Sequence, residues 1–222
     1  LLDTFRRLTK EEIFDWIYKS IDKYGLSLVS KNGYDFYNCE SSKGLGEYNK
    51  AGYNKLRDDF NKKASKDNEY YLMLYLLIVY SFNNQLRFNR KGEFNLPVGK
   101  RDFNSKMQGK LEAFIDRVKS GDYRFTTDDF RNVSMEDYTD KSFFYADPPY
   151  LITCATYNEQ AGWTENDEKD LLNYLEELDK KGIRFALSNV LESKGKKNVI
   201  LSEWINQNKK FKAIPLNYDY TN

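Results

Sequence analysis

The residues best suited to chemistry form the run Asp147-Pro148-Pro149-Tyr150, directly after the apolar segment 143–146. That segment predicts a buried strand, and ligands of open α/β sheets bind beyond the carboxyl ends of the strands. The prolines have no N–H, so their carbonyls are acceptors held beside the Asp147 carboxylate. These acceptors suit the two hydrogens of an exocyclic amine, and the Tyr150 ring suits stacking on a base that carries one. The alternative is a proline pair that only ends a strand.

Composition narrows the chemistry further. The 222 residues contain no histidine, which excludes Ser-His-Asp and Cys-His nucleophile systems and HExxH metal sites. The 35 basic and 34 acidic residues give a net charge of +1, so any nucleic-acid surface must be local.

The cysteines and the apolar segments predict the compartment. Cys39 and Cys154 match no metal-binding spacing and indicate free thiols in a reducing compartment, with a disulfide as the alternative. No signal peptide opens the sequence, and the most apolar stretch, 70–82, is shorter than the about 20 residues that span a bilayer. We expect a cytoplasmic protein with no membrane segment and no metal.

A second group of candidate residues is basic or carries side-chain amides. Leu86 and Phe88 on one side of Gly92, and Phe94 and Leu96 on the other, predict a hairpin over 86–98. A two-stranded ribbon can enter the DNA major groove, where Arg reads guanine and Asn reads adenine. A solvated edge hairpin protected by its charges is the alternative. The predicted DNA-binding residues here are Arg87, Asn89, Arg90, Lys91, Asn95, Lys100 and Arg101.

The elements that must position these residues change in type near residue 120. The earlier part is mostly helical, with a capping box at Thr9–Glu12 and a glycine stop at Gly25. The later part alternates strands with helices, which predicts a parallel sheet covered by helices. The predicted helices are 47–64, 67–82, 104–119, one that begins after a capping box at Thr164–Asp167, and 198–208; the predicted strands are 123–130, 143–146, 183–189 and 211–218.

The run DPPY after an apolar strand resembles motif IV of the adenine-N6 DNA methyltransferases. The segments RFNRKGEFNLPVGK before it, and TYNEQAGWTENDEKDLL and GIRFALSNV after it, are similar to the Dam-like (D12 class) members. The resemblance implies a Rossmann-like, doubly wound α/β fold. It implies a methyltransferase catalytic domain at 1–29 and 104–222, and a target-recognition domain at 30–103.

The resemblance also implies the reaction. S-adenosyl-L-methionine would donate a methyl group to N6 of an adenine flipped out of double-stranded DNA, with no covalent enzyme intermediate. Asp129-Phe130 resembles the acidic-Phe motif beside the cofactor adenine, and an N-capping role for Asp129 is the alternative. Tyr157 lies in a loop expected to close over DNA. The catalytic residues implied are Asp147, Pro148, Pro149 and Tyr150, and the cofactor-binding residues are Asp129, Phe130 and Asp147; Ser188 and Asn189 would line the pocket or form a turn.

Two cofactor motifs of the family have no counterpart in these residues. The Gly-rich turn after a first strand and the acid after a second strand are missing, and Gly44-Leu45-Gly46 follows no predicted strand. We expect a preceding segment or a partner chain to supply the Gly-rich motif. The alternatives are a truncated, inactive DNA-binding remnant and an amino-methyltransferase of RNA or protein glutamine. The enzyme would be solitary or part of a restriction-modification system.

Overall fold

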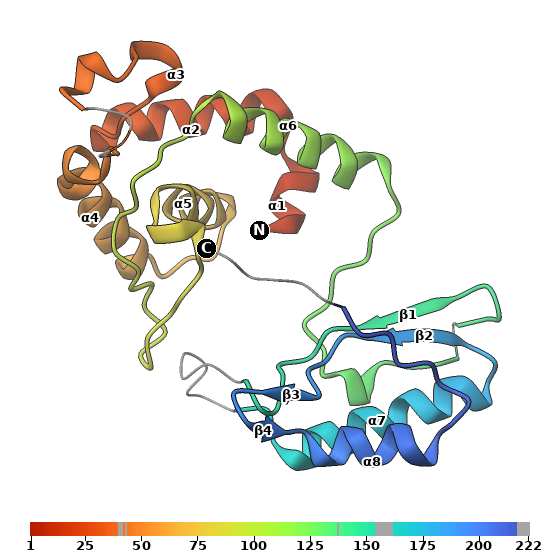
Figure 1. The fold of residues 1–222 in the computed structure, drawn as a ribbon. Coiled ribbons are helices and arrows are strands. Elements are labelled where there is room, and N and C mark those ends of the chain that lie inside the picture. The colour runs from red at the N-terminus through yellow and green to blue at the C-terminus, as the bar shows by residue number, and fades with distance from the viewer. Residues whose placement is uncertain (40–41, 43, 137, 154–161, 217–222) are drawn as a thin grey trace. The chain divides into compact units, whose positions relative to one another are not determined.

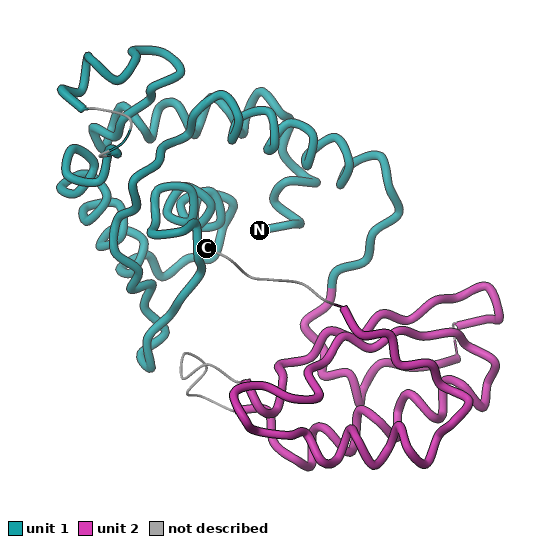
Figure 2. The backbone as a smooth tube through the Cα atoms, in the orientation of Figure 1, with its two compact units in different colours: residues 1–125 teal, residues 126–222 magenta. Residues whose placement is uncertain are grey.

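The computed structural model describes the 222-residue chain except residues 40–41, 43, 137, 154–161 and 217–222. The chain forms two compact units, Leu1–Phe125 and Thr126–Asn222, which Figure 2 colours separately. No described helix is both long enough and apolar enough to cross a membrane.

The first unit is built from helices around a buried central one. Its core includes Leu76, Leu77 and Tyr80 of α5, which packs against α1, α2 and α4 (Figure 1). The sequence predicts this burial because apolar residues occupy most faces of that helix. The helices are α1 (Leu2–Arg7), α2 (Lys10–Tyr24), α3 (Val29–Asn32), α4 (Gly46–Lys62), α5 (Asn68–Tyr80) and α6 (Ser105–Ser120), with 3-10 turns at Asp35–Tyr37 and Phe82–Asn84.

Local signals set the ends of α2. The Glu12 N–H donates to Thr9 Oγ1 at 3.1 Å, and the Thr9 N–H donates to Glu12 Oε2 at 2.7 Å, which is the predicted capping box. Gly25 ends the helix with φ 62° and ψ 37°, a left-handed conformation that glycine adopts without steric cost. Both predictions are confirmed.

The segment between α5 and α6 folds back on itself. Phe88 pairs with Phe94 and Ser81 with Val98 in single antiparallel bridges, and Gly92 turns the chain with φ 77°. The ladder is therefore short, with two bridged pairs among the described residues rather than continuous strands. Phe94 is buried whereas Phe88 is 40% exposed, so only part of the expected apolar side is anchored.

The described residues of the second unit form a β-α-β arrangement. β1 (Phe143–Ala146) pairs with β2 (Arg184–Leu187) in parallel, and α7 (Glu165–Lys180) connects them. α7 and α8 (Val199–Gln207) lie on one side of this strand pair (Figure 1). A small antiparallel pair, β3 (Glu192–Ser193) with β4 (Lys196–Lys197), and a 3-10 turn at Phe130–Asn132 complete the elements. The buried residues at their centre are Ala146, Leu171, Leu172, Leu175, Leu178, Ile183 and Leu201.

Two predicted strands are wrong. Residues 123–130 are irregular until the 3-10 turn at 130–132, and 211–216 form no strand, with 217–218 outside the described residues. A strand needs a neighbour for its backbone N–H and C=O groups, and the described part of the chain offers these two segments no such pairing. The described part of the chain therefore has mixed helices and strands with two small sheets, and the predicted doubly wound sheet is not confirmed.

Candidate active site and nucleic-acid interface

The ends of β1 and β2 bring three polar side chains together. The Ser188 N–H donates to the Ala146 carbonyl at 2.9 Å, which extends the pairing one residue past β2. The Tyr150 hydroxyl donates to Asp147 Oδ1 at 3.0 Å and lies 2.8 Å from Ser188 Oγ. A phenol has one hydrogen, so when it donates to Asp147 it accepts from Ser188. The Tyr150 side chain is thus held at its hydroxyl end from two elements.

The electrostatics of this cluster keep the phenol neutral. The Ser188 hydrogen bond lowers the pKa of Tyr150, but partial burial and the hydrogen bond to the Asp147 carboxylate together outweigh it, so the pKa is raised. Asp147 and Pro149 are exposed, and Pro148 and Tyr150 are half-buried. The carboxylate is therefore accessible from solvent while its neighbouring ring is fixed.

The carboxylate of Glu168 is buried at the start of α7, where it binds Asn189, the residue after Ser188. Glu168 is 1% exposed and accepts hydrogen bonds from Trp163 Nε1 at 2.6 Å, Asn189 Nδ2 at 2.9 Å and Asn198 Nδ2 at 2.8 Å. Sequence reasoning missed Glu168 because it lies in an acidic stretch typical of a solvated helix start. Its signal is its spacing, since it precedes Leu171 and Leu172 by three and four residues on the apolar stripe.

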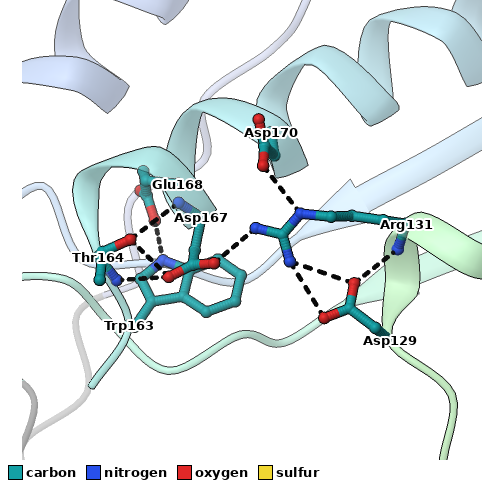
Figure 3. Close-up of polar contacts among 7 residues, drawn as sticks. All are labelled: Asp129, Arg131, Trp163, Thr164, Asp167, Glu168 and Asp170. Carbon is teal, nitrogen blue, oxygen red and sulfur yellow. Dashed lines mark hydrogen bonds and ion pairs between the residues drawn. The ribbon is translucent and has the colours of Figure 1, made fainter. Parts of the chain in front are cut away.

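The exposed Arg131 side chain joins Asp129 to the start of α7 (Figure 3). Asp129 Oδ1 accepts the Arg131 N–H at 2.9 Å, so Asp129 is the N-cap of the 3-10 turn. The Arg131 guanidinium donates from Nε to Asp170 at 2.8 Å, from Nη2 to Asp167 at 2.5 Å and from Nη1 to Asp129 at 3.1 Å. The capping role for Asp129, one of the two alternatives, is therefore present. Its cofactor role stays a prediction.

These contacts lower the pKa of Asp129 and Asp167 and raise the pKa of Arg131. Hydrogen bonds to the carboxylates raise the pKa of Arg131, with Asp170 the largest cause. Backbone and side-chain bonds from Arg131 lower the pKa of Asp129, and Thr164 followed by Arg131 lowers the pKa of Asp167 to about 2. Arg131, Asp129 and Asp167 are therefore ionised at neutral pH, and the Thr164 hydroxyl donates its hydrogen to Asp167. No local pattern indicates this role of Arg131, because Asp167 and Asp170 lie 36 and 39 residues away.

Phe130 packs beside aromatic residues of the same unit. Its ring centroid lies 6.0 Å from that of Trp163 and 6.0 Å from that of Tyr174. The half-buried Phe130 ring and the exposed Asp129 carboxylate are a chemically suitable pair for a purine with a polar edge.

The predicted DNA-binding residues fall into two sets. Arg87, Asn89 and Asn95 hydrogen-bond within the hairpin. Arg87 donates from Nε to Asn95 Oδ1 at 2.8 Å and from Nη2 to the Asn95 carbonyl at 3.0 Å. Asn89 Oδ1 accepts the N–H groups of Lys91 and Glu93, and its amide donates to Glu93. These side chains shape the turn in this structure.

The second set consists of cations with exposed side chains: Arg90, Lys91, Lys100 and Arg101. They place positive charge at the hairpin tip and its base, the arrangement expected for contact with phosphates. Tyr157 lies outside the described residues.

Side chains of helix α4 hydrogen-bond to the hairpin backbone, and the sequence did not predict these contacts. Asn61 Oδ1 accepts the Phe94 N–H at 2.8 Å, and Asn61 Nδ2 donates to the Phe94 carbonyl at 3.1 Å. The buried Tyr53 hydroxyl donates to the Leu96 carbonyl at 3.1 Å, and Arg57 donates to the same carbonyl at 3.5 Å. These side chains replace the ladder bonds that the short hairpin lacks.

The Gly44-Leu45-Gly46 pair has a packing role. A Cβ on Gly44 would lie 2.5 Å from Lys100 Cβ, and one on Gly46 would lie 3.1 Å from the Gly99 carbonyl oxygen. The Leu45 N–H donates to the Lys100 carbonyl at 2.9 Å, so the glycines allow close backbone approach at the end of the hairpin. Among the described residues, no group of three or more His, Cys, Asp or Glu side chains could hold a metal ion.

Comparisons with known proteins give a consistent family. The sequence model of the D12 class N6 adenine-specific DNA methyltransferase family matches residues 5–221. The chain is 39% identical over 165 residues to modification methylase LlaI of Lactococcus lactis subsp. lactis, covering 72% of this chain and 26% of that protein. It is 33% identical over 228 residues to type II methyltransferase M.FokI of Planomicrobium okeanokoites, covering 100% and 31%. The DNA adenine methylase of Escherichia coli (strain K12) is 30% identical over 141 residues, covering 62% and 49%. The chain thus spans about a third or less of the first two relatives.

Proposed function

Because the chain belongs to the D12 class N6 adenine-specific DNA methyltransferases, we propose that it methylates N6 of adenine in double-stranded DNA. The observation that carries this proposal is the position of Asp147-Pro148-Pro149-Tyr150 at the carboxyl end of β1, with its carboxylate exposed and its tyrosine held by Ser188. Ligands of parallel sheets bind at this edge.

The proposed mechanism uses orientation and electrostatics. S-adenosyl-L-methionine, when bound, supplies an electrophilic methyl group on a sulfonium. The Asp147 carboxylate and the Pro148 carbonyl accept the two N6 hydrogens of a flipped adenine, which directs the nitrogen lone pair away from the ring plane. In the transfer, the bond from N6 to the methyl carbon would form as the bond from that carbon to the sulfonium breaks and leaves a neutral thioether, and the N6 proton would pass to Asp147 or water. Pro149 keeps the turn rigid because its ring restricts φ.

The remaining site residues orient the base and the cofactor. The Tyr150 ring stacks on the adenine, and its hydroxyl, held by Asp147 and Ser188, limits rotation of the ring. Asp129 and Phe130, together with Asp147, would hold the cofactor, with the Phe130 ring against its adenine. The half-buried ring and the exposed carboxylate support this assignment.

The hairpin is the proposed DNA reader. The exposed Arg90, Lys91, Lys100 and Arg101 support phosphate and base-edge contacts, whereas Arg87 and Asn95 shape the ribbon that presents them. We place residues 30–103 in the target-recognition domain and 1–29 with 104–222 in the catalytic domain. A DNA substrate also favours a cytoplasmic location. The names of LlaI and M.FokI favour a restriction-modification system.

Among the described residues, one face of the β1–β2 pair carries exposed aromatic side chains, which supports a further strand-bearing segment. Phe143 and Tyr145 point to the face opposite Phe144 and Ala146 and are 61% and 62% exposed. Parallel sheets are normally covered on both faces. We propose that a segment outside these residues, or a partner chain, covers this face, completes a doubly wound sheet and supplies the Gly-rich cofactor motif. The longer relatives support this.

A methyl-transfer assay tests the function. The 222-residue chain would be incubated with labelled S-adenosyl-L-methionine and duplex DNA, and the digested product examined for N6-methyladenine. We expect a signal that Asp147→Ala removes. DNA binding without transfer would instead support the inactive remnant. Transfer to RNA or to a glutamine peptide in preference to DNA would contradict the substrate.

A further inference from the structure

Glu168 is connected to Tyr150 through a short series of contacts. Its Oε1 accepts from Asn189 Nδ2 at 2.9 Å, and Asn189 directly follows Ser188. The Ser188 N–H bonds to Ala146 at the end of β1, and its hydroxyl lies 2.8 Å from the Tyr150 hydroxyl. The Glu168 carboxylate thus holds the turn that carries Ser188. Among the described residues, Ser188 and Asp147 are the side chains that hydrogen-bond to the Tyr150 hydroxyl.

The Glu168 carboxylate also binds the far end of the segment that follows β2, residues 189–198. Oε1 also accepts from Asn198 Nδ2 at 2.8 Å, and Asn198 is fully buried as the N-cap of α8. The Asn198 N–H donates in turn to the Leu191 carbonyl at 2.9 Å. Asn189 and Asn198 flank the β3–β4 pair, so one side chain of α7 fixes both ends of this ten-residue segment.

Only a carboxylate suits this arrangement. Three neutral N–H donors, those of Trp163, Asn189 and Asn198, converge on its two oxygens. A glutamine has one acceptor oxygen, so its NH₂ would face at least one of these donors. Burying an ionised group costs free energy unless its hydrogen bonds are complete, and an apolar residue would serve packing alone better. Charge at the N-terminus of α7 is already supplied by Glu165 and Asp167.

We infer that Glu168 is a positioning residue for the Tyr150 ring, acting through Asn189 and Ser188 on the turn after β2. The consequence for catalysis rests on the proposed methyl transfer, whereas the positioning itself does not. Figure 3 shows Glu168 beside Trp163, whose indole N–H occupies the other carboxylate oxygen.

The chain offers a matched control on the same helix. Glu176 Oε1 accepts from Trp204 Nε1 at 2.7 Å and from Asn208 Nδ2 at 3.2 Å. Glu176 therefore also binds one indole and one amide, but its partners lie on and just after α8 rather than at the end of β2. Glu176→Gln likewise replaces a carboxylate of α7 that binds one indole and one amide, but neither partner belongs to the turn after β2.

The test reads the Tyr150 phenol directly in the 222-residue chain. 3-Fluorotyrosine, which ionises at lower pH than tyrosine, is placed at position 150, and its pKa is measured by ¹⁹F NMR in the wild type and three variants. The Ser188 contact lowers the pKa of Tyr150, so Ser188→Ala should raise it. Glu168→Gln should raise the pKa in the same direction, and Glu176→Gln should leave it unchanged.

Activity provides the second measurement. Glu168→Gln should lower kcat about 10- to 100-fold with KM for DNA nearly unchanged, because a displaced orienting group affects the reacting geometry. A Tyr150 pKa in Glu168→Gln equal to that of the wild type, with Ser188→Ala shifted, overturns the inference. If the wild type transfers no methyl group, the proposed function fails while the NMR comparison still decides the positioning.

A second variant covers a failure of Glu168→Gln to fold. Asn189→Ala removes the bond between Glu168 and the turn after β2, together with the bond that the Val190 N–H donates to Asn189 Oδ1 at 2.7 Å, and leaves the carboxylate with Trp163 and Asn198. It should reproduce the Tyr150 shift. A folded Asn189→Ala protein with the wild-type Tyr150 pKa would refute the connection.

Discussion

Replacing Asn61 by alanine should loosen the hairpin while the helical unit stays folded. Asn61 accepts from the Phe94 N–H at 2.8 Å and donates to the Phe94 carbonyl at 3.1 Å. A hydrogen bond contributes about 0.5–1.5 kcal/mol net, so losing both lowers the free energy of local opening by about 1–3 kcal/mol. At about 1.4 kcal/mol per tenfold, hairpin amides should exchange about 5- to 150-fold faster.

Amide hydrogen exchange followed by NMR measures this change. The informative probes are the Asn89 N–H, which donates to the Glu93 carbonyl, and the Asn95 N–H, which donates to the Arg87 carbonyl. The amides of buried Ile17 and Ile21 in α2 are internal references and should not change.

Lys55→Ala is the matched control variant, because Lys55 is exposed on the same helix. It should leave the hairpin amides at their wild-type rates. Unchanged exchange at Asn89 and Asn95 in Asn61→Ala would refute the reasoning. It would show that burial of Phe94, which is 1% exposed, holds the hairpin without Asn61.

Three further predictions concern the site and the surface charges. Asp147→Ala should abolish methyl transfer in the labelled-methyl assay and leave DNA affinity within about twofold, because the carboxylate acts on the flipped base and not on phosphates; retained turnover would contradict its role. Lys100→Ala should weaken binding equally at all DNA sequences and lower the slope of log K against log salt by about 1; an unchanged slope would exclude a phosphate contact. The pKa of Asp167 is lowered from 3.8 to about 2, so its ionised form stabilises the fold above pH 3.8 and this contribution is lost as pH falls toward 2. The urea midpoint of Asp167→Asn should therefore fall less steeply than that of the wild type between those pH values, and parallel profiles would refute this.

The helix boundaries and the motif at the end of β1 could be predicted from the sequence. The capping boxes at Thr9 and Thr164 join residues three positions apart, and the Asp147–Tyr150 run is contiguous. Such features depend on local geometry, which any fold of the chain must respect. The β1-α7-β2 order followed in the same way from the alternation of patterns.

The conformation of segment 123–130 could not be predicted in this way. Its residues look like those of a strand, but a local pattern does not reveal whether another strand lies beside it. The stacked rings of Tyr123 and Phe125, with centroids 6.1 Å apart, occupy this stretch instead. Strand formation depends on a pairing partner, which is a property of the tertiary structure.

The same distinction separates the candidate residues from their partners. Composition and spacing identified Asp147, Tyr150 and the hairpin cations, because their chemistry is carried by residue type. The hydrogen bonds of Ser188 to Tyr150 and of Glu168 to Asn189 join residues 38 and 21 positions apart. The sequence alone determined that reactive groups lie at the ends of elements. Which side chains hold these groups was decided only by the packing of α7 on the parallel strands, because such contacts depend on where distant elements meet.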